Sequence, residues 1–203
     1  MNVLPREFYD RNDVVAIATD LLGKIIITRF DGVITSARIV ETEAYNGIID
    51  KASHAFGNRR TNRTEIMYGP PGFAYVYLCY GIHHLFNVVC NSHEIPHAVL
   101  IRAVEPVEGI SKMLERTGKK NADFTLTRGP GNVSKALGIK TFHTGLDLLD
   151  SEILIAEDGF RYSQKEIEKT PRIGVAYAGK DALLPYRFIV KGNKYVSKGK
   201  MGI

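Results

Sequence analysis

Alternating apolar and polar residues near the start of the chain predict a β-hairpin. Lys24–Arg29 and Val33–Glu43 are rich in β-branched side chains, as strands are. Phe30-Asp31-Gly32 joins them, and Asp-Gly is a strong signal for a tight hairpin turn. Side chains of a strand point alternately to its two faces. One face of the second strand is therefore expected to carry Ile39, Glu41, Glu43 and Tyr45.

The rest of the pattern predicts more strands, mixed with a few short helices. An amphipathic helix is expected between Asp13, a favoured N-cap residue, and Gly23, a favoured helix terminator. Two more helices are expected at Ile110–Arg116 and, after a glycine-rich turn, up to Gly138. Further strands are predicted at Phe73–Tyr80, His83–Val89, Ala98–Glu105, Ile153–Glu157, Ile173–Tyr177 and Arg187–Val190.

This mixture of elements indicates an α+β fold. We expect a single domain over residues 1–203, with a curved, mostly antiparallel sheet, short helices and a hairpin that protrudes at Gly81. The polar connection Asn46–Pro71 carries several arginines, and so long a loop is usually functional or disordered. The lysine-rich stretch Lys191–Lys200 is expected to be a frayed basic tail.

Composition narrows the class of protein. The chain has 203 residues, of which 44% are hydrophobic and 24% charged, which is typical of a globular domain. A net charge of +5 favours an anionic partner such as a phosphate backbone. Two cysteines make no disulfide framework, and no apolar run is long enough for a signal peptide or a membrane span. We therefore expect a cytoplasmic protein without membrane insertion.

Glu43 is the first candidate for chemistry. Glu41 and Glu43 close an apolar strand, so at least one carboxylate is expected at the margin of the core. The structural alternative is a salt bridge to Arg38 or Arg102, or exposure at the strand end. Glu43 stands out because an aromatic residue, a histidine and several arginines follow it. A partly desolvated carboxylate in such company can act as a general base.

Three tyrosines, Tyr75, Tyr77 and Tyr80, lie in or just after one predicted strand. Tyrosine is common in sheets, so packing is the ordinary interpretation and the preferred one for Tyr75. Tyr77 and Tyr80 are an odd number of residues apart and are expected on opposite faces. Tyr80 precedes the turn at Gly81, where there is little core to fill. It could enter a base stack while Tyr77 stacks on a base.

Metal and nucleotide signatures are weak in this sequence. Several histidines lie near Cys79 and Cys90, but no C-x-x-C or H-x-x-x-H pair is present. Gly129 and Gly131 lack the Lys-Ser or Lys-Thr pair of a P-loop. We therefore expect no metal site and no cofactor, whether ATP or NAD.

Several segments, taken in order, resemble the alkyladenine (3-methyladenine) DNA glycosylase family. They are Arg38–Tyr45, Tyr75–Gly81, Val99–Pro106, Arg128–Gly131, Arg172–Val175 and Arg187–Gly192. The resemblance covers nearly the whole chain and implies one DNA glycosylase domain, residues 1–203. It also implies action on double-stranded DNA containing damaged purines, in a bacterial cytosol or nucleoid. Nothing in the sequence requires a cofactor or more than a monomer.

The resemblance further implies a monofunctional enzyme of base excision repair. Such an enzyme flips an alkylated or deaminated purine out of the duplex and hydrolyses its N-glycosidic bond, leaving an abasic site. The implied lesions are 3-methyladenine, 7-methylguanine, hypoxanthine and ethenoadenine.

The resemblance assigns residues to these steps. Glu43 matches the carboxylate that activates the attacking water, while Arg102 and the main-chain carbonyl of Ile173 match the groups that hold it. The residues implied in holding or selecting the base are Tyr45, His54, Tyr77 and Asn87. The residues implied in DNA contact are Tyr80, which fills the gap in the duplex, and Arg59, Thr61, Arg63 and Lys135.

Two other function classes are compatible with the same residues. One is a non-catalytic module that bends or marks DNA through its basic loop and tyrosines. The other is a hydrolase of free nucleosides, in which Tyr80 would pack inside the protein.

Overall fold

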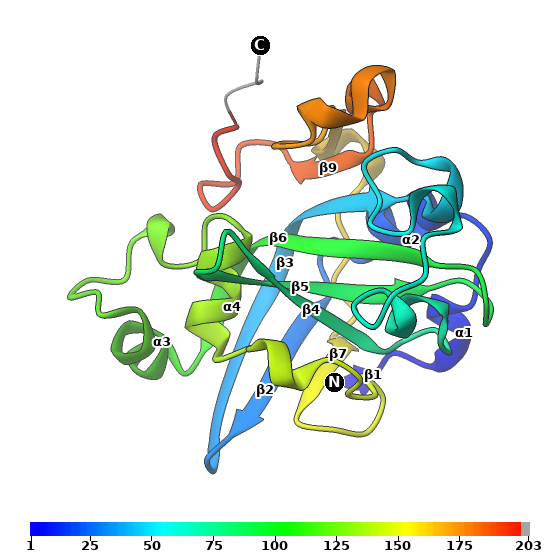
Figure 1. The fold of residues 1–203 in the computed structure, drawn as a ribbon. Coiled ribbons are helices and arrows are strands. Elements are labelled where there is room, and N and C mark those ends of the chain that lie inside the picture. Colours follow the sequence, from blue (N-terminus) through cyan, green and yellow to red (C-terminus); the bar gives the residue numbers. More distant parts are fainter. Residues whose placement is uncertain (200–203) are drawn as a thin grey trace.

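The computed structural model describes residues 1–199, and its centre is a strongly curved antiparallel sheet (Figure 1). The strands are β1 (Asn2–Val3), β2 (Ile25–Phe30), β3 (Val33–Tyr45), β4 (Ala74–Cys79), β5 (His83–Cys90), β6 (His97–Glu108), β7 (Ile153–Glu157), β8 (Ile167–Thr170) and β9 (Arg187–Val190). Their order is β1-β7-β2-β3-β6-β5-β4, while β9 pairs with both β3 and β8. The predicted α+β fold with a curved antiparallel sheet is confirmed.

Short helices pack on this sheet. The α-helices are α1 (Arg6–Tyr9), α2 (Val14–Asp20), α3 (Ile110–Thr117) and α4 (Pro130–Leu137). The 3-10 helices are η1 (Gly47–Ile49), η2 (Phe56–Asn58), η3 (Glu65–Tyr68), η4 (Phe124–Leu126), η5 (Thr141–His143), η6 (Gln164–Glu166) and η7 (Ala176–Leu183). Ile17 of α2 and Val133 of α4 belong to the same buried cluster as Ile39 and Ile101 of the sheet. One core therefore joins the helices to the strands.

Local sequence signals explain several of these elements. Asp13 caps α2, since its carboxylate accepts hydrogen bonds from the main-chain N–H groups of Val15 and Ala16. Asp31 and Gly32 both adopt positive φ in the two-residue turn between β2 and β3, as a tight hairpin requires. The predicted first helix and first hairpin are both confirmed.

The β4–β5 hairpin ends in the turn Tyr80-Gly81-Ile82, because Cys79 pairs with His83. Tyr80 and Gly81 have φ values of 51° and 73°. The Tyr80 side chain is 90% exposed. The predicted turn at Gly81 is therefore present and presents an aromatic ring to solvent.

The end of β3 departs from simple alternation. Its pairing with β6 shifts register on both sides of Glu41, which is the mark of bulges. Ile39 lies in the main core, whereas Glu41 and Glu43 lie in a network of charged side chains. The bulges therefore lie where β3 begins to carry buried carboxylates, and the part of the strand with Glu41 and Glu43 is its charged half.

Two predictions for the C-terminal part are wrong. Ile173–Tyr177 is not a strand, because Gly174 has a φ of 77° and the chain turns into η7. The lysine-rich stretch is not a frayed tail as far as the structure describes it: Ser197 makes hydrogen bonds to buried Glu41. Lys200 lies outside the described residues.

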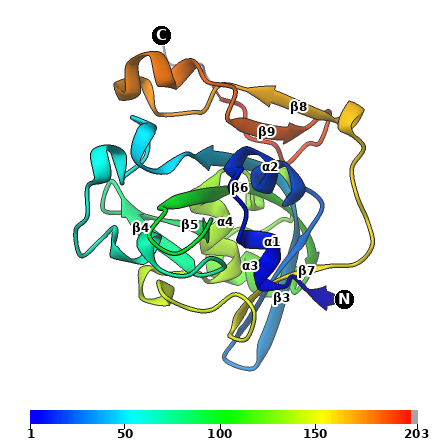
Figure 2. The same cartoon turned by 90° about the vertical axis from the view of Figure 1, so that its right-hand side faces the viewer.

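Strand β8 was not predicted, since its polar sequence Ile-Glu-Lys-Thr lacks an apolar face. Figure 2 shows the long connection from β7 running along one side of the molecule to reach β8. This path brings the last strand, β9, against β3 at Glu41 and Glu43. The last strand of the chain and an early strand thus meet at the charged half of β3.

Candidate active site

A cavity of about 440 Å³ opens beside the charged end of β3. Strands β4, β5 and β6 contribute to its walls, together with the loop after β3 and the turn before η7. The predicted site residues that line it are Tyr45, His54, Arg63, Tyr77, Tyr80, Asn87, Arg102 and Ile173. Residues that are far apart in the sequence therefore form one site, of a size typical for a small organic ligand.

Glu43 is fully buried directly behind this cavity. Its Oε1 accepts a hydrogen bond from the main-chain N–H of Ile173 (2.8 Å), and its Oε2 accepts one from the Tyr45 hydroxyl (2.9 Å). Nη1 of Arg102 lies 3.4 Å from Oε1. Three residues that line the cavity thus contact one carboxylate, whose position is set from several directions.

The surroundings of Glu43 shift the pKa values of its neighbours. Burial, and then the charge of Glu43, raise the pKa of Tyr45 well above its ordinary value. Burial acts to lower the pKa of Arg102, but the carboxylates of Glu43 and Glu41 outweigh it and raise this pKa. Tyr45 is therefore a neutral hydroxyl donor and Arg102 a fixed cation.

Aromatic rings form another wall of the cavity. His54 packs edge-on against Tyr77 with ring centroids 4.6 Å apart, and Tyr77 lies 5.7 Å from Tyr75. Nδ1 of His54 is 2.8 Å from the Tyr75 hydroxyl. Burial, and then Arg63 and Arg59, lower the pKa of His54 to about 4. At neutral pH this wall therefore presents an uncharged imidazole beside phenol rings, which suits a planar ligand.

Tyr75, which was expected to pack in the sheet, also positions two side chains of the cavity. Tyr75 is buried, and its hydroxyl also lies 3.3 Å from Nε of Arg63. The same hydroxyl contacts His54, so one phenol orients two residues of the cavity. The tyrosine-rich sequence of β4 indicated that its rings could matter for a site. Only the fold shows that the Tyr75 hydroxyl contacts His54 and Arg63.

Asn87 lies in the wall of the cavity with its amide held in place. Its Nδ2 donates to the main-chain carbonyls of Tyr75 and Leu85, at 3.2 Å each. The side chain is buried, so it has little room to turn. A ligand must therefore accommodate Asn87 rather than displace it.

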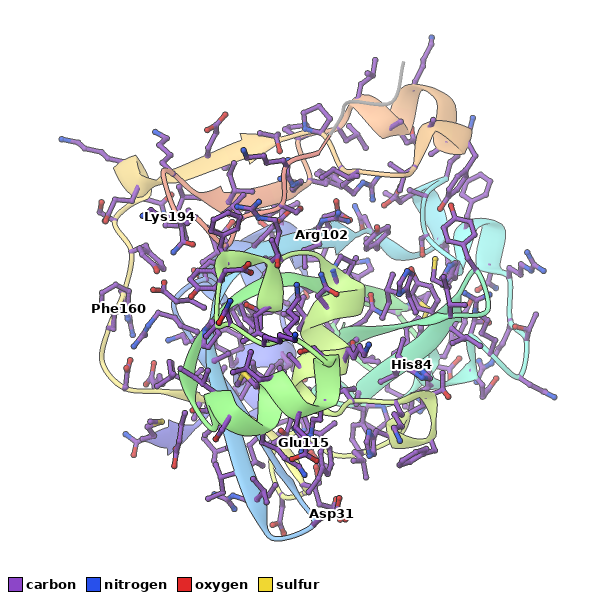
Figure 3. All side chains as sticks on the ribbon, turned by 90° about the vertical axis from the view of Figure 1, so that its left-hand side faces the viewer. Asp31, His84, Arg102, Glu115, Phe160 and Lys194 are labelled. Atoms are coloured by element: carbon purple, nitrogen blue, oxygen red, sulfur yellow. The ribbon has the colours of Figure 1, made fainter. Side chains whose placement is uncertain are left out.

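The predicted basic residues fall in different places. Arg63 lines the cavity and lies over the Tyr77 ring, 4.8 Å from its centroid. Arg59 and Thr61 lie in an adjoining pocket, which His54 and Arg63 also line. Lys135, on α4, lies instead in a separate groove of about 870 Å³ next to the β4–β5 hairpin. Figure 3 faces this side, where His84 and Glu115 mark the groove.

A second buried ion pair supports the cavity and was not predicted. Arg172 contacts both carboxylate oxygens of Asp50, at 2.5 and 2.9 Å, and both side chains are almost completely buried. Its guanidinium also lies 4.9 Å from the centroid of the Tyr45 ring. Arg172 thus connects the loop after β3 to the turn that carries Ile173.

Glu41 is the other buried carboxylate of β3. It pairs with Arg102 and with Arg187 rather than with Arg38, which pairs with Asp158. The predicted alternative of a salt bridge to Arg102 is thus present for Glu41, and Arg102 also pairs with Glu43.

Metal and membrane features are absent from the part of the chain that the structure describes. Within residues 1–199, no group of three or more histidine, cysteine, aspartate or glutamate side chains is placed to hold a metal ion. No helix in that range has the length and apolar character needed to cross a bilayer.

Comparison with known proteins gives consistent matches over nearly the whole chain. The family model for methylpurine-DNA glycosylase (MPG) matches residues 7–194. A protein of Alkaliphilus oremlandii named "Putative 3-methyladenine DNA glycosylase" is 46% identical, over 96% of this chain and 98% of that protein. Proteins with the same name from Clostridium acetobutylicum and Bdellovibrio bacteriovorus are 45% and 43% identical, and the alignments cover 97% and 99% of those proteins.

Proposed function

From the membership of this chain in the methylpurine-DNA glycosylase family, whose members are hydrolases of N-glycosyl bonds, we propose its reaction. The protein excises alkylated and deaminated purines from duplex DNA, with water activated by Glu43. The observation that carries this proposal is the buried Glu43 carboxylate behind an aromatic cavity. The expected substrates of the enzyme are 3-methyladenine, 7-methylguanine, hypoxanthine and ethenoadenine in duplex DNA, and the expected product is an abasic site.

The proposed reaction is a hydrolysis without a covalent enzyme intermediate. A water beside Glu43 gives its proton to the carboxylate while its oxygen forms a bond to C1′ of the sugar. The bond from C1′ to the purine nitrogen breaks, and its electron pair leaves with the base. An alkylated purine such as 3-methyladenine is already cationic and departs as a neutral molecule. Hypoxanthine departs as an anion and requires a proton.

Arg102 and the backbone of Ile173 are the proposed partners for that water. Arg102 lies 3.4 Å from Glu43, and Ile173 donates its N–H to the same carboxylate. A water bound to Glu43 would therefore lie within reach of both residues. The main-chain carbonyl of Ile173 is the proposed hydrogen-bond acceptor for the second O–H of the water, which stays on the oxygen.

The remaining cavity residues suit a flipped purine. We infer that the base inserts between Tyr45 on one side and His54 with Tyr77 on the other, since these rings line the same cavity. The immobile amide of Asn87 is the proposed obstacle to the exocyclic amine of undamaged guanine.

DNA contact is proposed for the hairpin and the basic loop. Tyr80 would fill the gap left by the flipped base, and its 90% exposure is what such an insertion requires. The alternative hydrolase of free nucleosides expects Tyr80 to pack inside the protein, and the exposed ring contradicts that expectation. Arg59, Thr61, Arg63 and Lys135 are the proposed phosphate contacts.

The test is base release from a duplex oligonucleotide that carries a single hypoxanthine, with alkaline cleavage to reveal abasic sites. Glu43→Gln keeps the shape of the side chain but removes the base, so the single-turnover rate should fall by about 100-fold or more. Retained activity in this variant would reject the proposed mechanism. Duplex binding without release by the wild-type protein would instead favour the damage-marking module. An alkylated duplex, assayed in parallel, separates that result from a narrower lesion range.

A further inference from the structure

The C-terminal segment, residues 193–199, reaches two residues of the cavity wall, Arg102 and Ile173. The main-chain N–H of Ser197 donates to Oε2 of Glu41 at 2.7 Å, and its hydroxyl donates to Oε1 at 2.6 Å. The carbonyl of Ser197 accepts a hydrogen bond from Arg187 at 2.8 Å. These contacts join the end of the described chain to the middle of the sheet.

Glu41 is the centre of this arrangement. The carboxylate is fully buried and also accepts hydrogen bonds from Nε of Arg102 (3.0 Å) and Nε of Arg187 (2.6 Å). A buried charge is stable only when it is paired and hydrogen-bonded, and here two guanidinium groups and Ser197 meet that need. Glu41 does not line the cavity, so its effect on a bound base must pass through Arg102.

The bond to Glu41 determines how Arg102 faces the catalytic carboxylate. Because Nε points to Glu41, the planar guanidinium turns Nη1 toward Glu43. The resulting distance of 3.4 Å is longer than the 2.7–2.9 Å or so of a strong charge-assisted hydrogen bond. Arg102 therefore lies close to Glu43 without closing on it.

A second contact of the C-terminal segment, between Gly199 and Ile173, also leads to Glu43. A side chain at Gly199 would overlap the side chain of Ile173, so the two residues lie in direct contact. The N–H of Ile173 is a donor to Glu43. The C-terminal segment thus reaches Glu43 through Arg102 and also through Ile173.

We propose that Glu41 and Ser197 are positioning residues for base excision, which hold Arg102 at a set distance from Glu43 and make residues 193–199 part of the active site. This inference rests on the proposed role of Glu43. It predicts that a change at Ser197, which does not line the cavity, alters the chemical step more than DNA binding.

The experiment compares three variants of the full-length chain. Ser197→Thr keeps the hydroxyl, Ser197→Ala removes it, and Ser197→Pro removes both the hydroxyl and the N–H that bond to Glu41. The matched control is Ser163→Ala, which removes a hydroxyl bonded to an exposed carboxylate, that of Glu166. Single-turnover base release and duplex affinity are measured on a hypoxanthine-containing duplex, with the thermal midpoint of each variant as a check of folding.

A shift of about 1 Å in a catalytic group can cost about 100-fold in rate. We expect Ser197→Ala to be about tenfold slower and Ser197→Pro about 100-fold slower, while duplex affinity changes less than twofold. Ser197→Thr and Ser163→Ala should match the wild type. The acid-side midpoint of the pH–rate profile should also move in Ser197→Pro, because the cation facing Glu43 has moved.

Wild-type rates in both Ser197→Ala and Ser197→Pro would overturn the inference. So would equal losses of rate and affinity with an unmoved pH profile, since that result indicates general loosening. Activity retained in Glu43→Gln would instead overturn the proposed function, whatever Ser197 does. An inactive Glu43→Gln together with normal Ser197 variants would overturn only this inference.

Discussion

Tyr80 combines a strained backbone with a side chain that has little protein around it. Its φ of 51° is a conformation that residues other than glycine adopt at a cost of roughly 1–2 kcal/mol. The residue is 90% exposed, so side-chain packing does not offset that cost. Such strain at an exposed position is compatible with the proposed insertion of the ring into DNA.

Replacement of Tyr80 by glycine should therefore separate stability from DNA binding. Relief of the positive φ and the greater freedom of glycine in the unfolded chain nearly cancel, so the free energy of unfolding should change by less than about 1 kcal/mol. Duplex affinity should fall about tenfold, because a stacked aromatic ring contributes about 1–3 kcal/mol. Urea denaturation and competition binding measure the two effects.

Phe160→Ala is the matched control for Tyr80, since Phe160 is an exposed aromatic at the opposite edge of Figure 3 from His84 of the hairpin. It should leave duplex affinity unchanged. Unchanged affinity in Tyr80→Gly would contradict insertion of the hairpin into DNA.

The lowered pKa of His54 leads to a prediction about how folding stability depends on pH. Its pKa in the folded protein is about 4, against 6.5 as the ordinary value. Between pH 6.5 and 4 the unfolded chain binds a proton that the folded protein does not, so stability is lost as the pH falls through this window. Above pH 6.5 both states are neutral and the contribution vanishes.

His54→Gln removes this titration. From pH 7.5 to pH 5, the wild type should lose about 1–2 kcal/mol more stability than this variant, as urea denaturation at the two pH values would show. His93→Gln, at an exposed histidine, is the control. Equal pH dependence in wild type and His54→Gln would mean that His54 is not held neutral.

At the scale of elements, the buried pair of Asp50 and Arg172 ties the loop after β3 to the turn that carries Ile173. Asp50→Asn would leave the Arg172 charge buried without a partner, which typically costs about 3–5 kcal/mol. The fall in the free energy of unfolding should appear in urea denaturation. Glu65→Gln, in an exposed pair with Arg60, should have little effect. Similar losses in the two variants would show that burial of the pair is unimportant.

At the scale of the molecule, the net charge of +5 should appear in the salt dependence of DNA binding. Each phosphate contact that is removed should lower the slope of log affinity against log salt by about one unit. Arg59→Ala and Lys135→Ala should each have this effect. Lys165→Ala is the control, because η6 and the loop with η1 to η3 lie on opposite sides in Figure 2. An unchanged slope would remove that residue from the interface.

Local signals in the sequence were sufficient for most of the fold. The Asp13 cap, the Asp31-Gly32 turn and the turn at Gly81 each act within a few residues, so pattern and turn chemistry predicted them. The Ile173–Tyr177 strand failed because a positive φ at Gly174 outweighs the apolar alternation around it. The resemblance to a family supplied the candidate residues, since Glu43 and Ile173 are 130 positions apart.

The residue pattern was enough to predict the antiparallel α+β class, the exposed aromatic hairpin and the type of chemistry that a carboxylate with tyrosines allows. The partners of the two β3 carboxylates are visible only in the folded chain. Glu43 contacts Tyr45 and Ile173 of the cavity wall. Glu41 shares Arg102 with it and otherwise contacts Arg187 and Ser197, which do not line the cavity. Glu41 and Glu43 look alike in the pattern, but bulges in β3, the arrival of β9 and the hydrogen bonds of Ser197 give them different partners. Contacts between segments so far apart leave no local signal, because they depend on where the folded chain returns.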